Sequence, residues 1–169
     1  DLQDILENFV GADGQFTSVV KSLTIRLNDE RLKGMRIVDT PGVNDPVVSR
    51  EHRTREFLRE CHGVFFLSFA SRFFDSTDVD FLTNRIGSQG IGTVVLIASK
   101  FDSVLQDSGS KFEDDLGNAI EDCQRQLKAQ FRRNLSGSDY RGEEPRFTMS
   151  SGIGYSIANK KPSEWDSME

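Results

Sequence analysis

Short apolar runs that end abruptly in polar residues constrain the fold of this chain more than any other feature. Met35–Asp45 reads MRIVDTPGVND, and Ala98–Asp102 reads ASKFD. Each run has the pattern of a buried strand with polar residues directly at its carboxyl end. In a parallel sheet such strand ends meet along one edge, where open α/β folds bind their ligands. The two runs therefore predict an α/β fold with a ligand site assembled at strand ends.

Further apolar runs predict the central strands of a mostly parallel sheet. Gly63–Ala70 reads GVFFLSFA, and Thr93–Ser99 reads TVVLIAS and is rich in β-branched residues. Near-continuous apolar runs of this length are typical of parallel strands that are covered on both faces. Arg146–Ser151, which reads RFTMSS, predicts a last short strand.

The first part of the chain predicts an antiparallel hairpin. Phe16–Leu27 alternates in part between apolar and polar residues, and the polar connection NDERLKG leads from it into Met35–Val38. Apolar residues at helical spacing and capping signals predict flanking helices over residues 1–10, 49–61, 77–86, 111–135 and 163–168. Because strands alternate with helices after the hairpin, we expect right-handed crossovers within one domain that spans residues 1–169.

Composition excludes several classes of protein. The 169 residues carry a formal net charge of −6, whereas a broad nucleic-acid surface needs clustered Lys and Arg. Hydrophobic residues make up 36% and charged residues 28%, which is typical of a globular protein. Cys61 and Cys123 form no metal-like pair, which favours reduced thiols in a cytoplasmic protein. No apolar run approaches the roughly 20 residues that cross a bilayer.

The DTPG turn, Asp39–Gly42, has residues suited to a phosphate and its metal ion. Mg²⁺ keeps several water molecules, and Asp39 at the end of an apolar strand can hold the ion through one of them. Gly42 lets the backbone approach closely, so that its N–H can donate to a terminal phosphate oxygen. Thr40 lies between them and is assigned to nucleotide binding. The alternative is a plain strand-to-loop turn.

The SKFD and MSSG runs have residues suited to recognising a base. Asp102 can accept from two adjacent N–H groups of guanine, a pattern that adenine does not present. Lys100, which follows Ser99, can lay its alkyl stem along the purine face. The backbone N–H groups of Ser150 and Ser151 could meet the guanine carbonyl oxygen. Each run alone also fits a strand end with solvated polar residues, but SKFD after DTPG at this spacing favours a guanine site.

Together these runs resemble the motifs of translation-factor-related GTPases. DTPG is similar to the third motif of those proteins, SKFD to the fourth (Asn or Thr, then Lys-x-Asp), and MSSG to the fifth. The stretch LKGMRIVDTPGVNDP, followed by a helix and GVFFLSFAS, is similar to dynamin-like GTPases, with the bacterial branch nearest. The resemblance covers residues 16–152 and implies GTP or GDP with Mg²⁺ as ligands.

The resemblance also implies a GTP-hydrolysing domain of a larger protein that self-associates and remodels membranes through helical parts outside this chain. Such a protein is expected in the cytoplasm, with peripheral membrane contact as a second location. The chain departs from the pattern because it has no GxxxxGKS or GxxxxGKT loop, and because Ser99 replaces the usual Asn or Thr. We therefore expect a P-loop GTPase-like sheet that lacks its first strand. We also expect a chain that by itself binds nucleotide poorly and hydrolyses it negligibly.

Two other functions stay open at this point. The chain could be a module of a pseudo-GTPase, which serves as a protein-interaction scaffold without catalysis. It could also belong to an ATP-using α/β protein in which DTPG only resembles the motif. The sequence upstream of Asp1 would separate the first alternative from a GTPase, and a comparison of GTP with ATP binding would separate the second.

Overall fold

The computed structural model describes residues 2–11, 14–17, 19–20, 22–40, 57–87, 91–108 and 115–161. The chain divides into two compact units, Asp1–Asp39 and Thr40–Glu169, and each is described by itself. The expectation of one domain over the whole chain stays a prediction.

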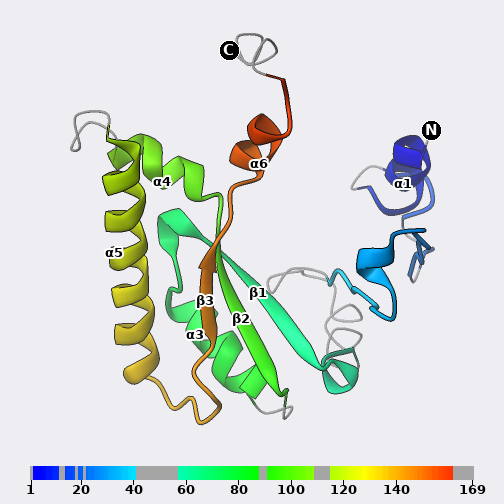
Figure 1. Cartoon of the computed structure of the whole chain (residues 1–169). Coiled ribbons are helices and arrows are strands. Elements are labelled where there is room, and N and C mark those ends of the chain that lie inside the picture. The colour runs from blue at the N-terminus through cyan, green and yellow to red at the C-terminus, as the bar shows by residue number, and fades with distance from the viewer. Residues whose placement is uncertain are drawn as a thin grey trace. The chain divides into compact units, whose positions relative to one another are not determined.

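A three-stranded parallel sheet forms the centre of the second unit (Figure 1). Its strands are β1 (Gly63–Phe69), β2 (Thr93–Ser99) and β3 (Arg146–Met149), in that spatial order. β1 and β2 pair along their whole length, from Gly63 opposite Thr93 to Phe69 opposite Ser99. The predicted strands are therefore confirmed as parallel strands, with β2 between β1 and β3 in the described sheet, and their carboxyl ends lie at one edge.

Helices connect and flank these strands. They are the 3₁₀ turn η2 (Ala70–Arg72), α3 (Ser76–Phe81), the π-helical turn η3 (Leu82–Ile86), α4 (Phe101–Ser108), α5 (Leu116–Ser136) and α6 (Gly152–Ala158). The helix predicted over 77–86 is formed by α3 and η3, and the one predicted over 111–135 is formed by α5. The sequence did not predict α4 or α6. Of the helix predicted over 49–61, the structure describes residues 57–60 as helical, and the one predicted over 163–168 lies outside the described residues.

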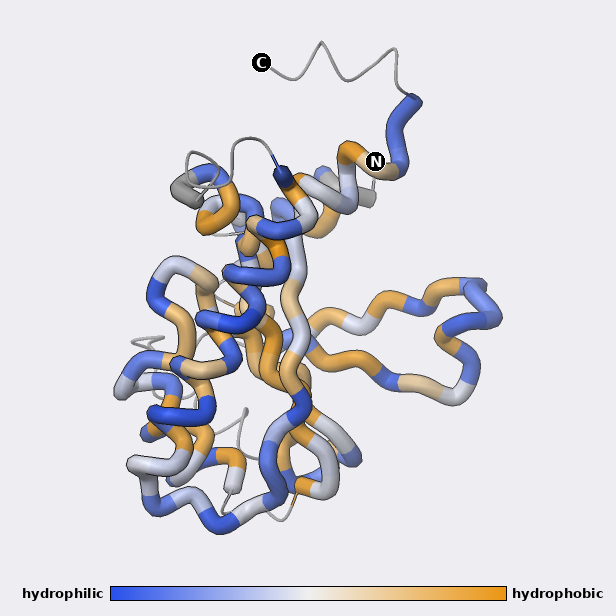
Figure 2. Tube along the Cα trace, turned by 60° about the vertical axis from the view of Figure 1, so that its left-hand side comes forward, coloured by the Kyte–Doolittle hydropathy of each residue, from blue (hydrophilic) through white to orange (hydrophobic). Residues whose placement is uncertain are grey.

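The hydrophobic core lies on the helix-covered face of the sheet. Fully buried side chains come from β2, η3, α5 and the turn after η2, and include Leu96, Leu82, Phe131 and Phe74. In Figure 2 the strands form the mostly hydrophobic centre of this unit, and the helices alternate hydrophobic with hydrophilic stretches. Such alternation at helical spacing places one face of each helix against the sheet.

The opposite face of β1 is open to solvent in the described part of the chain. Phe65, Leu67 and Phe69 are 68%, 61% and 43% exposed, whereas Phe66 and Ser68 between them are buried. The expectation that this strand is covered on both faces is therefore wrong for the structure described. Side chains alternate across a strand, and the packed helices contact only one of its two faces.

A segment just after β1 is held in place by buried hydrogen bonds. Ser68 Oγ accepts from the Phe74 N–H (2.9 Å) and donates to Asp78 Oδ2 (2.5 Å). Phe74 has a φ of 50°, in the left-handed region that costs a non-glycine residue about 1–3 kcal/mol. On α5, Asn134 Nδ2 donates to the Phe74 carbonyl (2.7 Å), and Gln130 Nε2 donates to the Phe73 carbonyl (2.5 Å). These contacts fix the unusual backbone at Phe74.

The first unit begins with α1 (Leu2–Val10), which confirms the predicted first helix. The antiparallel hairpin expected after it is not formed, because the described residues 22–29 and 35–40 belong to no strand. A 3₁₀ turn, η1 (Glu30–Leu32), and Gly34 with a φ of 74° occupy the expected connection. A strand requires a hydrogen-bonded neighbour, and the described residues of the first unit form no strand beside alternating side chains such as Leu27 (63% exposed) and Ile37 (71% exposed).

Candidate functional site

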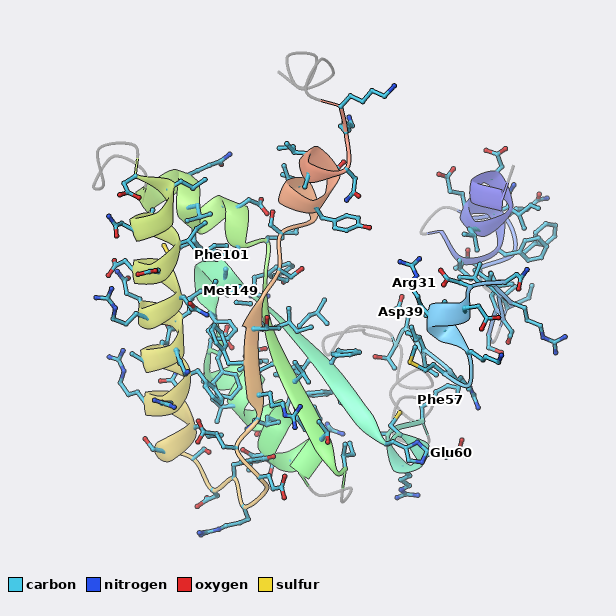
Figure 3. All side chains as sticks on the ribbon, in the orientation of Figure 1. Arg31, Asp39, Phe57, Glu60, Phe101 and Met149 are labelled. Atoms are coloured by element: carbon cyan, nitrogen blue, oxygen red, sulfur yellow. The ribbon has the colours of Figure 1, made fainter. Side chains whose placement is uncertain are left out.

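Backbone hydrogen bonds join the two polar runs that follow β2 and β3. The Ser150 N–H donates to the Ala98 carbonyl (2.9 Å), and the Phe101 N–H donates to the Ser150 carbonyl (3.1 Å). Figure 3 labels Phe101 and Met149, which belong to these runs and lie at the start of α4 and the end of β3. The pairing of the strands therefore continues into SKFD and MSSG, and it places the two runs side by side.

Asp102 and Ser151 form the direct side-chain contact between the two runs. Ser151 Oγ donates to Asp102 Oδ1 over 2.5 Å, and it also accepts from the Gly154 N–H (2.8 Å) as the N-cap of α6. Asp102 lies half-buried in the first turn of α4. An ionised carboxylate has about four acceptor positions, so one hydroxyl partner leaves room for two further N–H donors.

The Lys100 backbone makes a tight turn between β2 and α4. Its φ is 52°, and its carbonyl accepts from both the N–H (3.2 Å) and the hydroxyl (2.7 Å) of Ser103. The Lys100 side chain is exposed, with Nζ 4.8 Å from the centre of the Phe69 ring. The turn thus directs the lysine toward the end of the neighbouring strand β1.

Ser99 is bound to β1 through its side chain. Its hydroxyl donates to the Ser68 carbonyl over 3.1 Å, so the residue that replaces the usual Asn or Thr ties the ends of two adjacent strands together. Ser150 has a different environment from the one expected, because its N–H is already engaged by Ala98. The role of the Ser151 N–H as a donor to a base oxygen stays a prediction.

The residues predicted to contact phosphate and metal ion belong to a different part of the chain. Asp39 is exposed at the end of the first unit, Thr40 is exposed at the start of the second, and Gly42 lies outside the described residues. Mg²⁺ in nucleotide sites is commonly held by one or two carboxylates together with phosphate oxygens and water. A single accessible carboxylate at Asp39 fits that chemistry, and the roles of Asp39, Thr40 and Gly42 stay predictions.

Two residues near the site were not predicted from the sequence. Ser68 is the one hydroxyl in an otherwise apolar strand, which could have marked it as a buried hydrogen-bonding residue. Phe69 is the last residue of β1 and pairs with Ser99, so its position beside SKFD follows from the register of the sheet. Only knowledge of that register identifies it.

Other features of the described residues give no further site. The two best-defined pockets among the described residues are lined by residues outside SKFD and MSSG. No three His, Cys, Asp or Glu side chains within the described ranges are grouped so that they could hold a metal ion. Among the helices that the structure describes, none combines the length and apolar character of a membrane span.

Comparison with known proteins gives a family match and two bacterial relatives. A sequence model of the Dynamin family matches residues 3–100. "Dynamin-like protein 1" of Campylobacter jejuni subsp. jejuni is 35% identical over 98 residues, which is 57% of this chain and 14% of that protein. "Bacterial dynamin-like protein" of Nostoc punctiforme is 28% identical over 104 residues, which is 62% of this chain and 14% of that protein. No solved structure matches significantly.

Proposed function

Because the chain belongs to the dynamin family, we propose that it supplies the base-recognising and phosphate-sensing parts of a GTP-hydrolysing domain in a larger protein. The observation that carries this proposal is the contact between Asp102 and Ser151 at adjacent strand ends. It brings together two sequence runs, separated along the chain, that were assigned to the same base on chemical grounds.

The proposed base site uses acceptors and donors in a fixed arrangement. Asp102 accepts the two adjacent N–H groups of guanine, and the Ser151 hydroxyl keeps the carboxylate oriented. Ser151 also offers a backbone N–H to the guanine carbonyl oxygen, while Ser150 supports the loop through its bond to Ala98. Lys100 covers one face of the purine with its stem. Adenine lacks the paired donors that Asp102 requires, so the site favours GTP and GDP over ATP.

The proposed phosphate side uses the DTPG turn. Asp39 would hold a bound Mg²⁺ ion through a water molecule. Thr40 contributes to nucleotide binding, and the Gly42 N–H donates to the terminal phosphate. A bound Mg²⁺ ion would neutralise phosphate charge during hydrolysis, which consists mainly of positioning and charge stabilisation. Residues that cradle the other phosphates must come from elsewhere in the protein, so the chain by itself should hydrolyse GTP negligibly.

The wider role of the protein follows from its family. Since the aligned part of the chain covers 14% of each curated relative, most of a protein of that size lies outside the aligned region. We propose a cytoplasmic, bacterial, dynamin-like protein that self-associates through its GTPase domain. Any peripheral contact with membranes, and any remodelling of them, would use segments other than this chain.

The decisive experiment compares nucleotide binding by the full-length protein and two matched variants. Asp102→Asn removes one negative charge and replaces an acceptor with a donor, whereas Asp139→Asn makes the same change in an exposed loop beyond α5. Labelled GTP, ATP and xanthosine triphosphate are titrated against each protein. Xanthine carries a carbonyl oxygen where guanine carries its amino group, so the donor of Asn should accommodate it.

We expect the wild-type protein and Asp139→Asn to prefer GTP over ATP by at least tenfold, with Asp102→Asn losing that preference and gaining xanthosine triphosphate. A guanine preference that survives unchanged in Asp102→Asn would remove Asp102 from its role. Equal binding of ATP and GTP by the wild type would favour the ATP-using alternative. Absence of all nucleotide binding would favour the scaffold alternative.

A further inference from the structure

Two cationic side chains lie over the aromatic ring of Phe69 at the end of β1. Lys100 Nζ is 4.8 Å from the ring centre, and the guanidinium carbon of Arg72 is 5.4 Å from it. Both distances are within the approximately 6 Å over which a cation is attracted by an aromatic face. The ring is 43% exposed, so it borders solvent at the edge where the strand ends meet.

Three independent features hold the ring and the lysine together. Phe69 is the register partner of Ser99, so it lies directly beside the residue that precedes Lys100. The Ser99 hydroxyl donates to the Ser68 carbonyl and locks the two strand ends in that register. The left-handed backbone of Lys100 is secured by Ser103, which limits where its side chain can point.

We propose that Phe69 is a positioning residue for the nucleotide base, which acts by holding the Lys100 ammonium so that the lysine stem is ordered before the purine arrives. The inference rests on the proposed function and deepens it. A long, exposed lysine loses rotamer freedom when a base stacks on it, and binding is weakened by that loss. A ring that already restrains the ammonium reduces the loss, and so lowers the dissociation constant for the base.

The same strand offers a matched control. Phe65 belongs to the same open face of β1 and is 68% exposed, but it is paired with Val95 and is far along the strand from the SKFD run. Replacing either phenylalanine with leucine removes an exposed ring from one face of one strand. Only Phe69→Leu removes the ring that faces Lys100, so general effects on the sheet should appear equally in both variants.

The first test measures binding of a fluorescent N-methylanthraniloyl-GDP to the full-length protein. We expect Phe69→Leu to raise the dissociation constant about two- to fivefold, the range for an exposed cation–π contact, while Phe69→Tyr retains wild-type affinity and Phe65→Leu is unchanged. In a Lys100→Met background the effect of Phe69→Leu should disappear, because interacting residues are non-additive in a double-mutant cycle. An undiminished effect in that background, no effect at all, or tighter binding by Phe69→Leu overturns the proposal.

The second test detects the contact without nucleotide. Lysines of the chain are reductively ¹³C-dimethylated, which keeps their charge, and the Lys100 methyl signal is assigned with Lys100→Arg. We expect an upfield ring-current shift that is lost in Phe69→Leu and kept in Phe65→Leu. A Lys100 signal at the position of free dimethyl-lysine overturns the inference. A shifted signal in a protein that binds no guanine nucleotide instead refutes the proposed function and leaves the contact standing.

Discussion

Removal of the buried Ser68 hydroxyl is expected to destabilise the second unit substantially. The hydroxyl accepts from the Phe74 N–H at 2.9 Å and donates to Asp78 at 2.5 Å, and Ser68 is only 4% exposed. In Ser68→Ala the Phe74 N–H stays buried without this acceptor, which costs about 1–3 kcal/mol. The hydrogen bond to the carboxylate adds about 1.5 kcal/mol, at the low end for a charged partner because water reaches the half-buried Asp78. The total loss is therefore about 2.5–4.5 kcal/mol.

Urea unfolding of the chain provides the measurement. Ser68→Ala should lower the midpoint without changing the slope, since the surface exposed on unfolding is the same. Ser76→Ala makes the same substitution at an exposed position of α3, and it should change the free energy of unfolding by less than about 0.5 kcal/mol. If Ser68→Ala loses no more than Ser76→Ala, the hydroxyl does not hold the left-handed Phe74 backbone, and the reasoning fails.

Three further changes test other parts of the structure. Burial raises the pKa of Asp78 above its ordinary 3.8, so its contribution to stability is present below that pH and is lost as the pH rises through the raised value. The free energy of unfolding of Asp78→Asn, measured in urea, should therefore increase relative to that of the wild type as the pH rises above 3.8. A difference between the two proteins that does not change with pH would contradict this sign. Ser151→Ala removes an N-cap, which should cost about 1 kcal/mol and speed amide hydrogen exchange in the first turn of α6; unchanged exchange would argue against the cap. Phe131→Ala empties a core position and should lower the free energy of unfolding by about 3–5 kcal/mol, measured by thermal or urea unfolding. Leu116, which is exposed on the same helix, is the control. If Phe131→Ala costs less than Leu116→Ala, α5 is not packed as described.

The strands could be predicted because their signals are local. TVVLIAS is apolar and β-branched over its whole length, and its strand, Thr93–Ser99, has the predicted bounds. α4 was missed because it starts directly after Lys100, which offers no side-chain cap as a start signal. α6 was missed because its sequence, GIGYSIA, contains two glycines, and because the capping Ser151 was interpreted as a strand end. The hairpin failed because alternation indicates a strand only where a neighbouring strand is present.

The candidate site was predictable in outline and not in detail. The meeting of SKFD and MSSG follows from parallel strands having their carboxyl ends at one edge, and the bond between Ser151 and Asp102 agrees with it. The engagement of the Ser150 N–H by Ala98 depends on how far strand pairing extends, which no residue pattern specifies. The approach of Lys100 to Phe69 depends on both the register and a left-handed turn.

The Ser151 hydroxyl belongs to two contacts at once, since it donates to Asp102 and accepts from Gly154 at the start of α6. A group shared in this way links the two equilibria in which its partners take part. If a ligand at Asp102 changes the equilibrium constant for fraying of the first turn of α6 by some factor, fraying changes the affinity for that ligand by the same factor. This follows from thermodynamic reciprocity. The order of one short helix thus reports whether a ligand is bound at Asp102.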